Sequence, residues 1–242
     1  MHQQGPEGLD VAVIGFGSGV TVGTTLSFPV HSVDVIELER SIPEAARFFE
    51  DVNLLEYQLD HFPFVQMDRL TIINDDGRNY LASTDRSYDI IISEPSNPWI
   101  TGVSDLFTVD HFRIAKQRLR PGGVYCQWVQ LYEMSPENIK TIFRTFSEVY
   151  QNVVVFAADD RSSDTVVIGS DAPLTFDLER FQHVWALEQV PGRMSVPEQM
   201  ERAYLHTPYD VFARVLLASR DEVRTYAQVE EHRHGDTWET DY

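Results

Sequence analysis

The stretch from Val11 to Glu39 constrains the fold of this chain more than any other part of the sequence. It opens with four consecutive apolar residues, 11–14, as expected of a strand that is buried on both faces of a parallel sheet. Glycines follow at positions 15, 17 and 19, and a second apolar run, 33–38, carries the acid Glu37 near its end. This order predicts a strand, a glycine turn, a helix and a second strand.

The glycine turn has the composition of a nucleoside-binding site. Gly15, Gly17 and Gly19 let the backbone approach a ligand closely, and Glu37 is placed to accept hydrogen bonds from ribose hydroxyls. Glycines also mark ordinary turns, but this motif follows an expected strand, opens an expected helix and precedes an acid by about 20 residues. Because Val20 replaces the last glycine of a GxGxxG pattern, the turn suits S-adenosylmethionine-type ligands at least as well as NAD.

Composition limits the classes of protein to which the chain can belong. Its 242 residues suffice for one α/β domain with an appendage, and one cysteine, Cys126, excludes an internal disulfide and a cysteine cluster for a metal. The formal net charge of −19 argues against nucleic-acid binding, which relies on Lys and Arg. No apolar run reaches the roughly 20 residues that span a bilayer, and no signal peptide is visible. We therefore expect a cytoplasmic chain, or the cytoplasmic side of a membrane protein.

Further strands are expected after the first two, at residues 70–73, 88–92, 124–129, 153–157 and 165–169. The short polar connection between the last two of these strands predicts an antiparallel hairpin. Ser41 and Glu44 have the spacing of a capping box, which predicts a helix whose apolar side includes Phe48 and Phe49. We expect a Rossmann domain at residues 1–172 and a helical C-terminal extension at residues 173–242. Within the extension, Asp210 is expected to cap a helix over residues 211–217.

Two polar segments follow expected strands, at the edge where open α/β sheets bind ligands. Residues 74–77 have the chemistry of a turn and include the acid Asp76. Residues 94–98 place polar side chains between Pro95 and Pro98, which stop both strand and helix and so predict a shaped loop.

The order of elements resembles the class I S-adenosylmethionine-dependent methyltransferase fold, an α/β Rossmann sheet of seven mostly parallel strands with a terminal antiparallel hairpin. Within that superfamily, residues 11 to about 170 resemble the polyamine aminopropyltransferases, the spermidine synthase family. The resemblance rests on the segments VIGFGSG, VIELERSIPEAARFF, LTIINDDGRNYL, YDIIISEPSNPWITGVSDLFTVDHF and LRPGGVYCQW. The wording SEPSNPW with QWVQLY is similar to spermidine synthase-like domains that some bacterial membrane proteins carry after their transmembrane helices.

The resemblance implies transfer of an aminopropyl group from decarboxylated S-adenosylmethionine to a polyamine such as putrescine, without a metal. It implies that Glu37 binds the ribose and that Asp76, with Gly77 beside it, binds the adenine amino group. The acidic loop of the family maps onto residues 94–98, and a homodimer is a further expectation. Members of the family also carry an N-terminal β-rich domain, so either this chain is part of a longer protein or its pocket is open.

The chain departs from the family pattern at two acids. Asn97 occupies the general-base position of DSSDP, and an amide cannot take a proton from an amine. Ser18 replaces the aspartate of GGGDG that faces the aminopropyl end of the donor. Glu94 keeps a carboxylate in the loop, and Tyr132, Gln127 and Gln130 are expected to add hydrogen bonds; the list of catalytic candidates is therefore Glu94, Asn97 and Tyr132.

Three functions remain open after the sequence is considered alone. The first is an aminopropyltransferase. The second is a methyltransferase that uses S-adenosylmethionine itself, whose carboxylate would tolerate Ser18 and Asn97 better than additional acids. The third is a catalytically weak nucleoside-binding module of a larger membrane protein.

Overall fold

A computed structural model of the protein describes residues 8–53, 55, 66–67, 69–96, 102–158, 164–187, 189 and 193–228. Within these ranges, nine strands form one sheet in the order β3-β4-β2-β1-β5-β6-β8-β7-β9. The strands are β1 Leu9–Ile14, β2 Val30–Glu37, β3 Gln66–Met67, β4 Leu70–Asn74, β5 Tyr88–Ser93, β6 Leu119–Gln130, β7 Asn152–Ala157, β8 Asp164–Ser170 and β9 Val215–Leu217.

The centre of the sheet is parallel. Strands β4, β2, β1, β5 and β6 run in one direction, and β8 pairs antiparallel with both β6 and β7. The predicted class I methyltransferase-like fold is therefore confirmed, with the hairpin β7–β8 at the expected place. The two additional strands, β3 and β9, are two and three residues long and lie at the edges of the sheet. Strands this short carry too few residues for a periodic pattern to reveal them.

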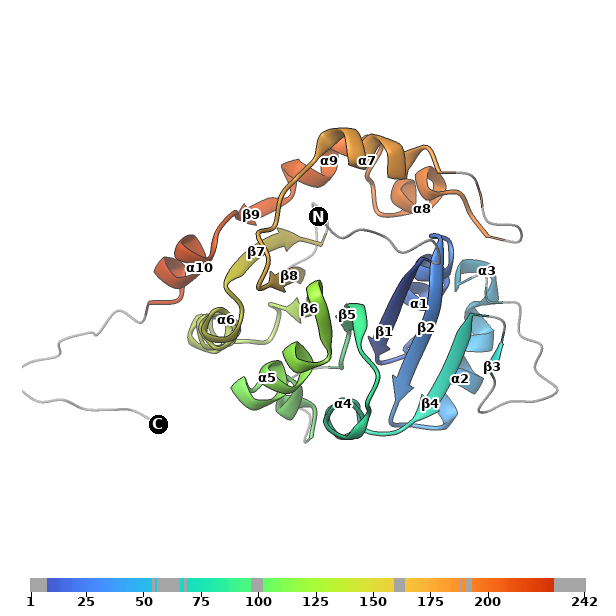
Figure 1. Cartoon of the computed structure of the whole chain (residues 1–242), viewed down its shortest axis with the longest axis horizontal. Helices are drawn as coiled ribbons and strands as arrows, with labels where there is room; N and C mark the ends of the chain where they lie inside the picture. Colours follow the sequence, from blue (N-terminus) through green and yellow to red (C-terminus); the bar gives the residue numbers. More distant parts are fainter. Residues whose placement is uncertain are drawn as a thin grey trace, which may run out of the picture.

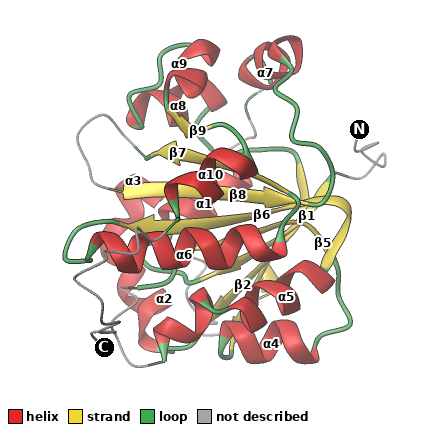
Figure 2. Cartoon of the chain, turned by 90° about the vertical axis from the view of Figure 1, so that its left-hand side faces the viewer, coloured by secondary structure: helices red, strands yellow, loops and turns green. Residues whose placement is uncertain are grey.

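Helices cover both faces of the sheet (Figures 1 and 2). Helices α4, α5 and α6 lie on one face and α1 lies on the other, while α7, α8 and α9 form an arch at the top of the view that runs from β9 to the α1 side of the sheet (Figure 1). The helices are α1 Val20–Leu26, α2 Ser41–Ala45, α3 Glu50–Asn53, α4 Gly77–Ser83, α5 Val109–Gln117, α6 Pro136–Val149, α7 Leu178–Trp185, α8 Val196–Arg202, α9 Pro208–Ala213 and α10 Arg220–Tyr226, with the 3₁₀ helices η1 Ala46–Phe49 and η3 Val103–Phe107.

Each face of the sheet has its own apolar core, and β1 contributes to both. Val11 and Val13 pack in the cluster on the α1 face, whereas Ala12 and Ile14 pack in the cluster formed with α4, α5 and α6. All four are at most 3% exposed. Since side chains alternate along a strand, an unbroken apolar run is what a strand between two helical layers requires.

Two expectations for the helices are wrong. Helix α2 begins at Ser41 itself, whose hydroxyl donates to Glu39 Oε1 at 3.0 Å, so Ser41 is no N-cap. The α-helical turn changes after Ala45 to the 3₁₀ helix η1, which breaks the expected period and leaves Phe48 and Phe49 88% and 47% exposed.

The expected cap at Asp210 is also wrong. Helix α9 begins at Pro208 after the N-cap Thr207, and Asp210 Oδ2 accepts hydrogen bonds from the backbone N–H groups of His206 and Thr207 at 2.8 and 2.7 Å. The helix ends at Ala213 because the next residues form β9, which pairs antiparallel with β7. Tertiary pairing thus overrides the helical pattern of this segment.

Besides the pairing of β9 with β7, helices α10 and α8 of the C-terminal segment contact the sheet domain. Helix α10 buries Val223 in the core beside α6, and Arg220 Nε donates to the carbonyl of Ser147 at 2.8 Å. Helix α8 docks on α1, where Gln199 donates to Ser27 Oγ at 3.3 Å and accepts from Thr24 Oγ1 at 3.2 Å. The domain boundary at residue 172 stays a prediction. In the part of the chain that the structure describes, no helix is both long and apolar enough to cross a membrane.

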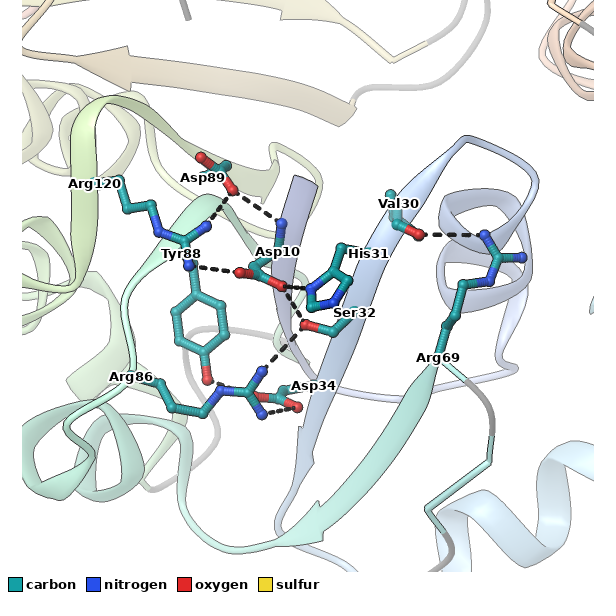
Figure 3. Close-up of polar contacts among 10 residues, drawn as sticks. All are labelled: Asp10, Val30, His31, Ser32, Asp34, Arg69, Arg86, Tyr88, Asp89 and Arg120. Atoms are coloured by element: carbon teal, nitrogen blue, oxygen red, sulfur yellow. Dashed lines mark hydrogen bonds and ion pairs between the residues drawn. The ribbon is translucent and has the colours of Figure 1, made fainter. Parts of the chain in front are cut away.

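A charged network ties the central strands together towards their amino ends (Figure 3). Arg120 of β6 bridges Asp89 of β5 and Asp10 of β1 at 2.6 and 2.5 Å. The fully buried Asp34 of β2 accepts from Arg86 at 2.7 Å and from the hydroxyl of Tyr88 at 2.7 Å. This network lies away from the carboxyl ends of the strands, so we assign it to the stability of the sheet.

Candidate functional site

The carboxyl ends of four parallel strands are connected by backbone hydrogen bonds. Gly15 N, after β1, donates to the carbonyl of Ile36 in β2 at 2.9 Å. Glu94 N, after β5, donates to the carbonyl of Ile14 at 2.9 Å, and Asp75 N, after β4, donates to that of Glu37 at 3.2 Å. The turn after β1 therefore lies at the centre of the edge where α/β sheets bind ligands.

The glycine turn packs closely against the loop after β5 at Gly15, whereas the space around Gly17 is open. Gly15 has φ +91°, and a Cβ there would lie 2.6 Å from the carbonyl oxygen of Glu94, so a side chain cannot be accommodated. Gly17 has φ +52° and is exposed, and among the described residues no atom lies within 4 Å of the position of a Cβ. Gly19 is the N-cap of α1, and its N–H donates to the carbonyl of Phe16 at 2.9 Å. The backbone around Gly17 is thus accessible to a ligand.

The Glu37 carboxylate is fixed against this turn. Its Oε2 accepts from Phe16 N at 2.8 Å, and its Oε1 accepts from Glu39 N at 2.8 Å. Each carboxylate oxygen has a second lone pair, so two hydroxyl donors of a ligand can still bind. The side chain is therefore held in one orientation before any ligand arrives.

Two asparagines that the sequence analysis missed support the turn. The buried Asn53 donates from Nδ2 to the carbonyls of Ser18 and Ala46 at 2.9 and 3.0 Å, and its Oδ1 accepts from Leu55 N at 2.9 Å. Asn74 donates from Nδ2 to the carbonyls of Glu37 and Leu38 at 2.9 and 2.8 Å.

Only one of the two asparagines could have been found from the sequence. Asn74 directly follows an expected strand in a turn segment, and this position indicates a residue at the ligand-binding edge of the sheet. Asn53 is 35 residues from Ser18, and no local pattern links the two.

Glu94 extends the site from β1 to the loop after β5. Its Oε2 accepts a hydrogen bond from the hydroxyl of Thr21 in α1. Glu94 as a whole residue is exposed, but the protein around its carboxyl group desolvates the charged form and raises its pKa, an effect that the Thr21 hydrogen bond only partly offsets. A carboxylate with a raised pKa is a better proton acceptor than an ordinary one.

Asp76 and Gly77 follow β4 and start α4. Asp76 is the N-cap of this helix, and its Oδ1 accepts from Asn79 N at 2.8 Å. A Cβ at Gly77 would lie 2.5 Å from Ile14 Cγ2, so the missing side chain lets α4 pack directly on β1. Gly77 therefore has a packing role that the sequence analysis did not assign.

The end of β6 and its following loop carry the remaining candidates. Gln127 is buried; its Oε1 accepts from Tyr125 Oη at 3.0 Å and its Nε2 donates to the carbonyl of Trp128 at 3.0 Å. Tyr132 lies on the loop after β6 and is 46% exposed. Asn97 lies outside the described residues.

The structure thus brings most of the predicted residues together. Hydrogen bonds or direct backbone continuity connect the candidates at the ends of β1, β2, β4 and β5, namely Gly15, Gly17, Ser18, Gly19, Glu37, Asp76, Gly77 and Glu94. Tyr132 lies on the loop that follows the neighbouring strand β6. The arrangement offers carboxylates for hydroxyl and cationic groups beside an accessible glycine backbone. Across the described ranges, no group of three or more His, Cys, Asp or Glu side chains is placed to hold a metal ion.

Comparison with known proteins gives a family match over most of the chain. The spermine/spermidine synthase domain profile matches residues 2–162. Polyamine aminopropyltransferase 2 of Hyperthermus butylicus is 30% identical over 154 residues, which are 63% of this chain and 48% of that protein. The chain therefore spans about half the length of this curated relative.

Solved structures agree on the fold. A spermidine synthase in complex with the transition-state analogue AdoDATO is similar with a TM-score of 0.65 and 19% identity, covering 86% of this chain and 69% of that one. Human methyltransferase-like protein 13 in complex with SAH is similar with a TM-score of 0.56 and 18% identity, covering 82% of this chain and 80% of that one. At these identities the likeness concerns the fold alone.

Proposed function

The chain belongs to the spermine/spermidine synthase family, and we propose that it binds decarboxylated S-adenosylmethionine and transfers the aminopropyl group to a polyamine such as putrescine. The observation that carries this proposal is the Glu94 carboxyl group, which is held by Thr21 next to the glycine turn and has a raised pKa. It supplies a proton acceptor at the edge of the sheet where the nucleoside would bind.

The nucleoside would be held by groups on three strand ends. The two fixed oxygens of Glu37 accept hydrogen bonds from the ribose hydroxyls, and the open backbone at Gly17 lets the ligand approach. Asp76 uses Oδ1 as a helix cap, so Oδ2 is the oxygen that accepts from the adenine amino group.

The reaction requires a neutral amine. The amine nitrogen forms a bond to the aminopropyl carbon beside the sulfonium while the carbon–sulfur bond breaks, and the bonding electrons stay on sulfur to give a neutral thioether. The amine must lose a proton, which Glu94 accepts because Asn97 carries an amide at the position where the family has its base. Tyr132 adds a hydrogen bond to the acceptor.

A second candidate is methyl transfer from S-adenosylmethionine. Ser18 favours it, because an uncharged residue in the glycine turn does not repel the carboxylate that only this donor carries. Ser18 does not itself select the acceptor, so the products decide between the two functions.

The test is a product assay with each donor. With decarboxylated S-adenosylmethionine and putrescine, we expect spermidine and 5′-methylthioadenosine by mass spectrometry; S-adenosylhomocysteine from S-adenosylmethionine would favour the second candidate. Glu94→Gln keeps an oxygen for Thr21 but removes the base, so turnover should fall by about 10²- to 10⁴-fold. Wild-type turnover in Glu94→Gln would refute the role of Glu94, and no product from either donor would refute transfer by this chain.

A further inference from the structure

Helix α1 carries Thr21, the residue that donates to Glu94, and its sequence is poorly suited to a helix. Five of its seven residues are β-branched and a sixth is Gly23. Such residues have low helix propensity, and so short a helix is marginal in water without tertiary contacts. The N-cap is Gly19, which has no side chain to cap the helix. The position of Thr21 therefore depends on what α1 packs against.

Two sides of α1 are supported by the sheet domain. Its apolar side chains are buried in the core of that face of the sheet. On another side, Gly23 packs against α3 so closely that no Cβ fits beside the carbonyl oxygen of Asn53. Thr21 and Thr24 are three residues apart, so they share a third side of the helix, one turn from each other. Both are half-buried.

This third side is contacted by Gln199 of α8, a buried residue that is 6% exposed. Its Oε1 accepts from Thr24 Oγ1 at 3.2 Å, and its Nε2 donates to Ser27 Oγ at 3.3 Å. Arg202 also donates to Oε1, at 3.2 Å. Because an arginine cannot accept a hydrogen bond, this contact fixes which end of the amide is the oxygen. Gln199 thus joins α8 to the last turn of α1 in one orientation.

Helix α8 is held in place independently of α1. Arg214, which is 8% exposed, donates to the carbonyl of Ala203 at the end of α8 and to that of Ala158 after β7, both at 2.6 Å. Arg214 directly precedes β9, which pairs with β7. A capping box of Ser195 and Glu198 closes the start of α8. Helix α8 can therefore resist a displacement of α1.

We propose that Gln199 is a positioning residue that keeps Thr21 in place to donate to the Glu94 carboxylate. It acts through Thr24, one turn further along the same side of α1. Since Thr21 occupies Oε2 of Glu94, Oε1 is left for the proton of the amine. The family profile ends at residue 162, so this support comes from the C-terminal segment. The consequence for turnover rests on the proposed aminopropyl transfer.

The first measurement is the pKa of the Glu94 carboxyl group, by NMR titration of protein with labelled glutamate carboxyls and with Glu94→Gln to assign the signal. The Thr21 hydroxyl stabilises the charged form, so Thr21→Val should raise this pKa further. Gln199→Leu should raise it in the same direction. The matched control is Arg220→Met, which removes a hydrogen bond between α10 and Ser147 far along the chain from α1 and should leave the pKa unchanged.

The Cys126 thiol of β6 is the other titratable group that senses the Glu94 charge. Burial above all, and then that charge, raises the pKa of this thiol to about 12, so it stays neutral throughout the titration. A change in the Glu94 pKa therefore reports on Thr21 rather than on Cys126.

The second measurement is turnover with decarboxylated S-adenosylmethionine and putrescine. Gln199→Leu should lower kcat by about 10-fold or more, because a small displacement of a catalytic group has a large effect on rate. The KM for the donor should change little, since the hydrogen bonds of Glu37 do not involve α8. The effects of Gln199→Leu and Thr24→Val should not add in the double variant, because both remove the same contact.

The outcomes separate this inference from the proposed function. An unchanged Glu94 pKa or an unchanged kcat in folded Gln199→Leu overturns the role of Gln199 and leaves aminopropyl transfer standing, as does an equal rise of the pKa in Arg220→Met. If Gln199→Leu does not fold, Thr24→Val decides in the same way. No product from wild type overturns the proposed function, and the NMR titration then decides on Gln199 by itself.

Discussion

Replacing Glu37 with glutamine should weaken donor binding more than any other single-atom change at this site. Both carboxylate oxygens accept backbone N–H groups at 2.8 Å, from Phe16 and from Glu39. Whichever way a glutamine amide is turned, its NH₂ group faces one of these donors, so one charge-assisted bond is lost in the free protein and the ribose hydroxyls meet a weaker acceptor. We expect Glu37→Gln to reduce donor affinity by on the order of 1 to 3 kcal/mol, or roughly 5- to 150-fold.

Isothermal titration calorimetry measures this loss, and thermal unfolding of the same samples shows that the variant is folded at the titration temperature. Glu39→Gln is the matched control, because Glu39 Oε1 contacts Ser41 and leaves the glycine turn untouched. Unchanged affinity in a folded Glu37→Gln, or an equal loss in Glu39→Gln, would refute the assignment of the ribose site.

The remaining predictions concern the hydrogen bonds of Asn53 to the glycine turn, the stability of the protein at acid pH, and the position of the general base. Asn53→Ala removes the hydrogen-bond donor to the Ser18 and Ala46 carbonyls, so the free energy of unfolding in urea should fall by about 2 to 4 kcal/mol. A loss below about 1 kcal/mol would contradict the stabilising role of these two hydrogen bonds. Burial raises the pKa of Asp10, but hydrogen bonds from Ser32, His31 and Arg120 outweigh it and lower the pKa from 3.8 to about 2. Its stabilisation is therefore present above about pH 4 and lost as pH falls towards 2, by up to roughly 2 kcal/mol, which Asp10→Asn should not show in acid titrations of stability. Asn97→Asp places a carboxylate at the family's base position, so in a Glu94→Gln background, which lacks the base of this chain, it should raise turnover with putrescine by about 10²- to 10⁴-fold; no gain would contradict the expected base position.

The central fold could be predicted because its signals are local. The apolar run 11–14 predicts a strand buried on both faces, and β1 contributes to both cores. The glycine turn and Glu37 were both predicted from the stretch 11–39, and in the structure Glu37 accepts a hydrogen bond from Phe16 N in this turn. Patterns of this kind are set by the side-chain period of a strand and by the geometry of a turn.

The rest depends on contacts between distant residues. Residues 215–217 were expected to be helical, but pairing with β7 makes them a strand. Phe48 and Phe49 were predicted to lie on the apolar side of a helix, but both belong to the 3₁₀ helix η1 and are exposed. The hydrogen bond from Asn53 to the carbonyl of Ser18 joins α3 to the glycine turn, and no periodic pattern in the sequence predicts a contact between these two segments.

The most direct test of the account is a calorimetric titration of the whole chain with decarboxylated S-adenosylmethionine and, separately, with S-adenosylmethionine. If the carboxyl edge of the sheet is a donor site for aminopropyl transfer, the decarboxylated form should bind with one-to-one stoichiometry and at least about 10-fold more tightly, since the acidic site disfavours the additional carboxylate. Tighter binding of S-adenosylmethionine, or no heat with either compound, would contradict it.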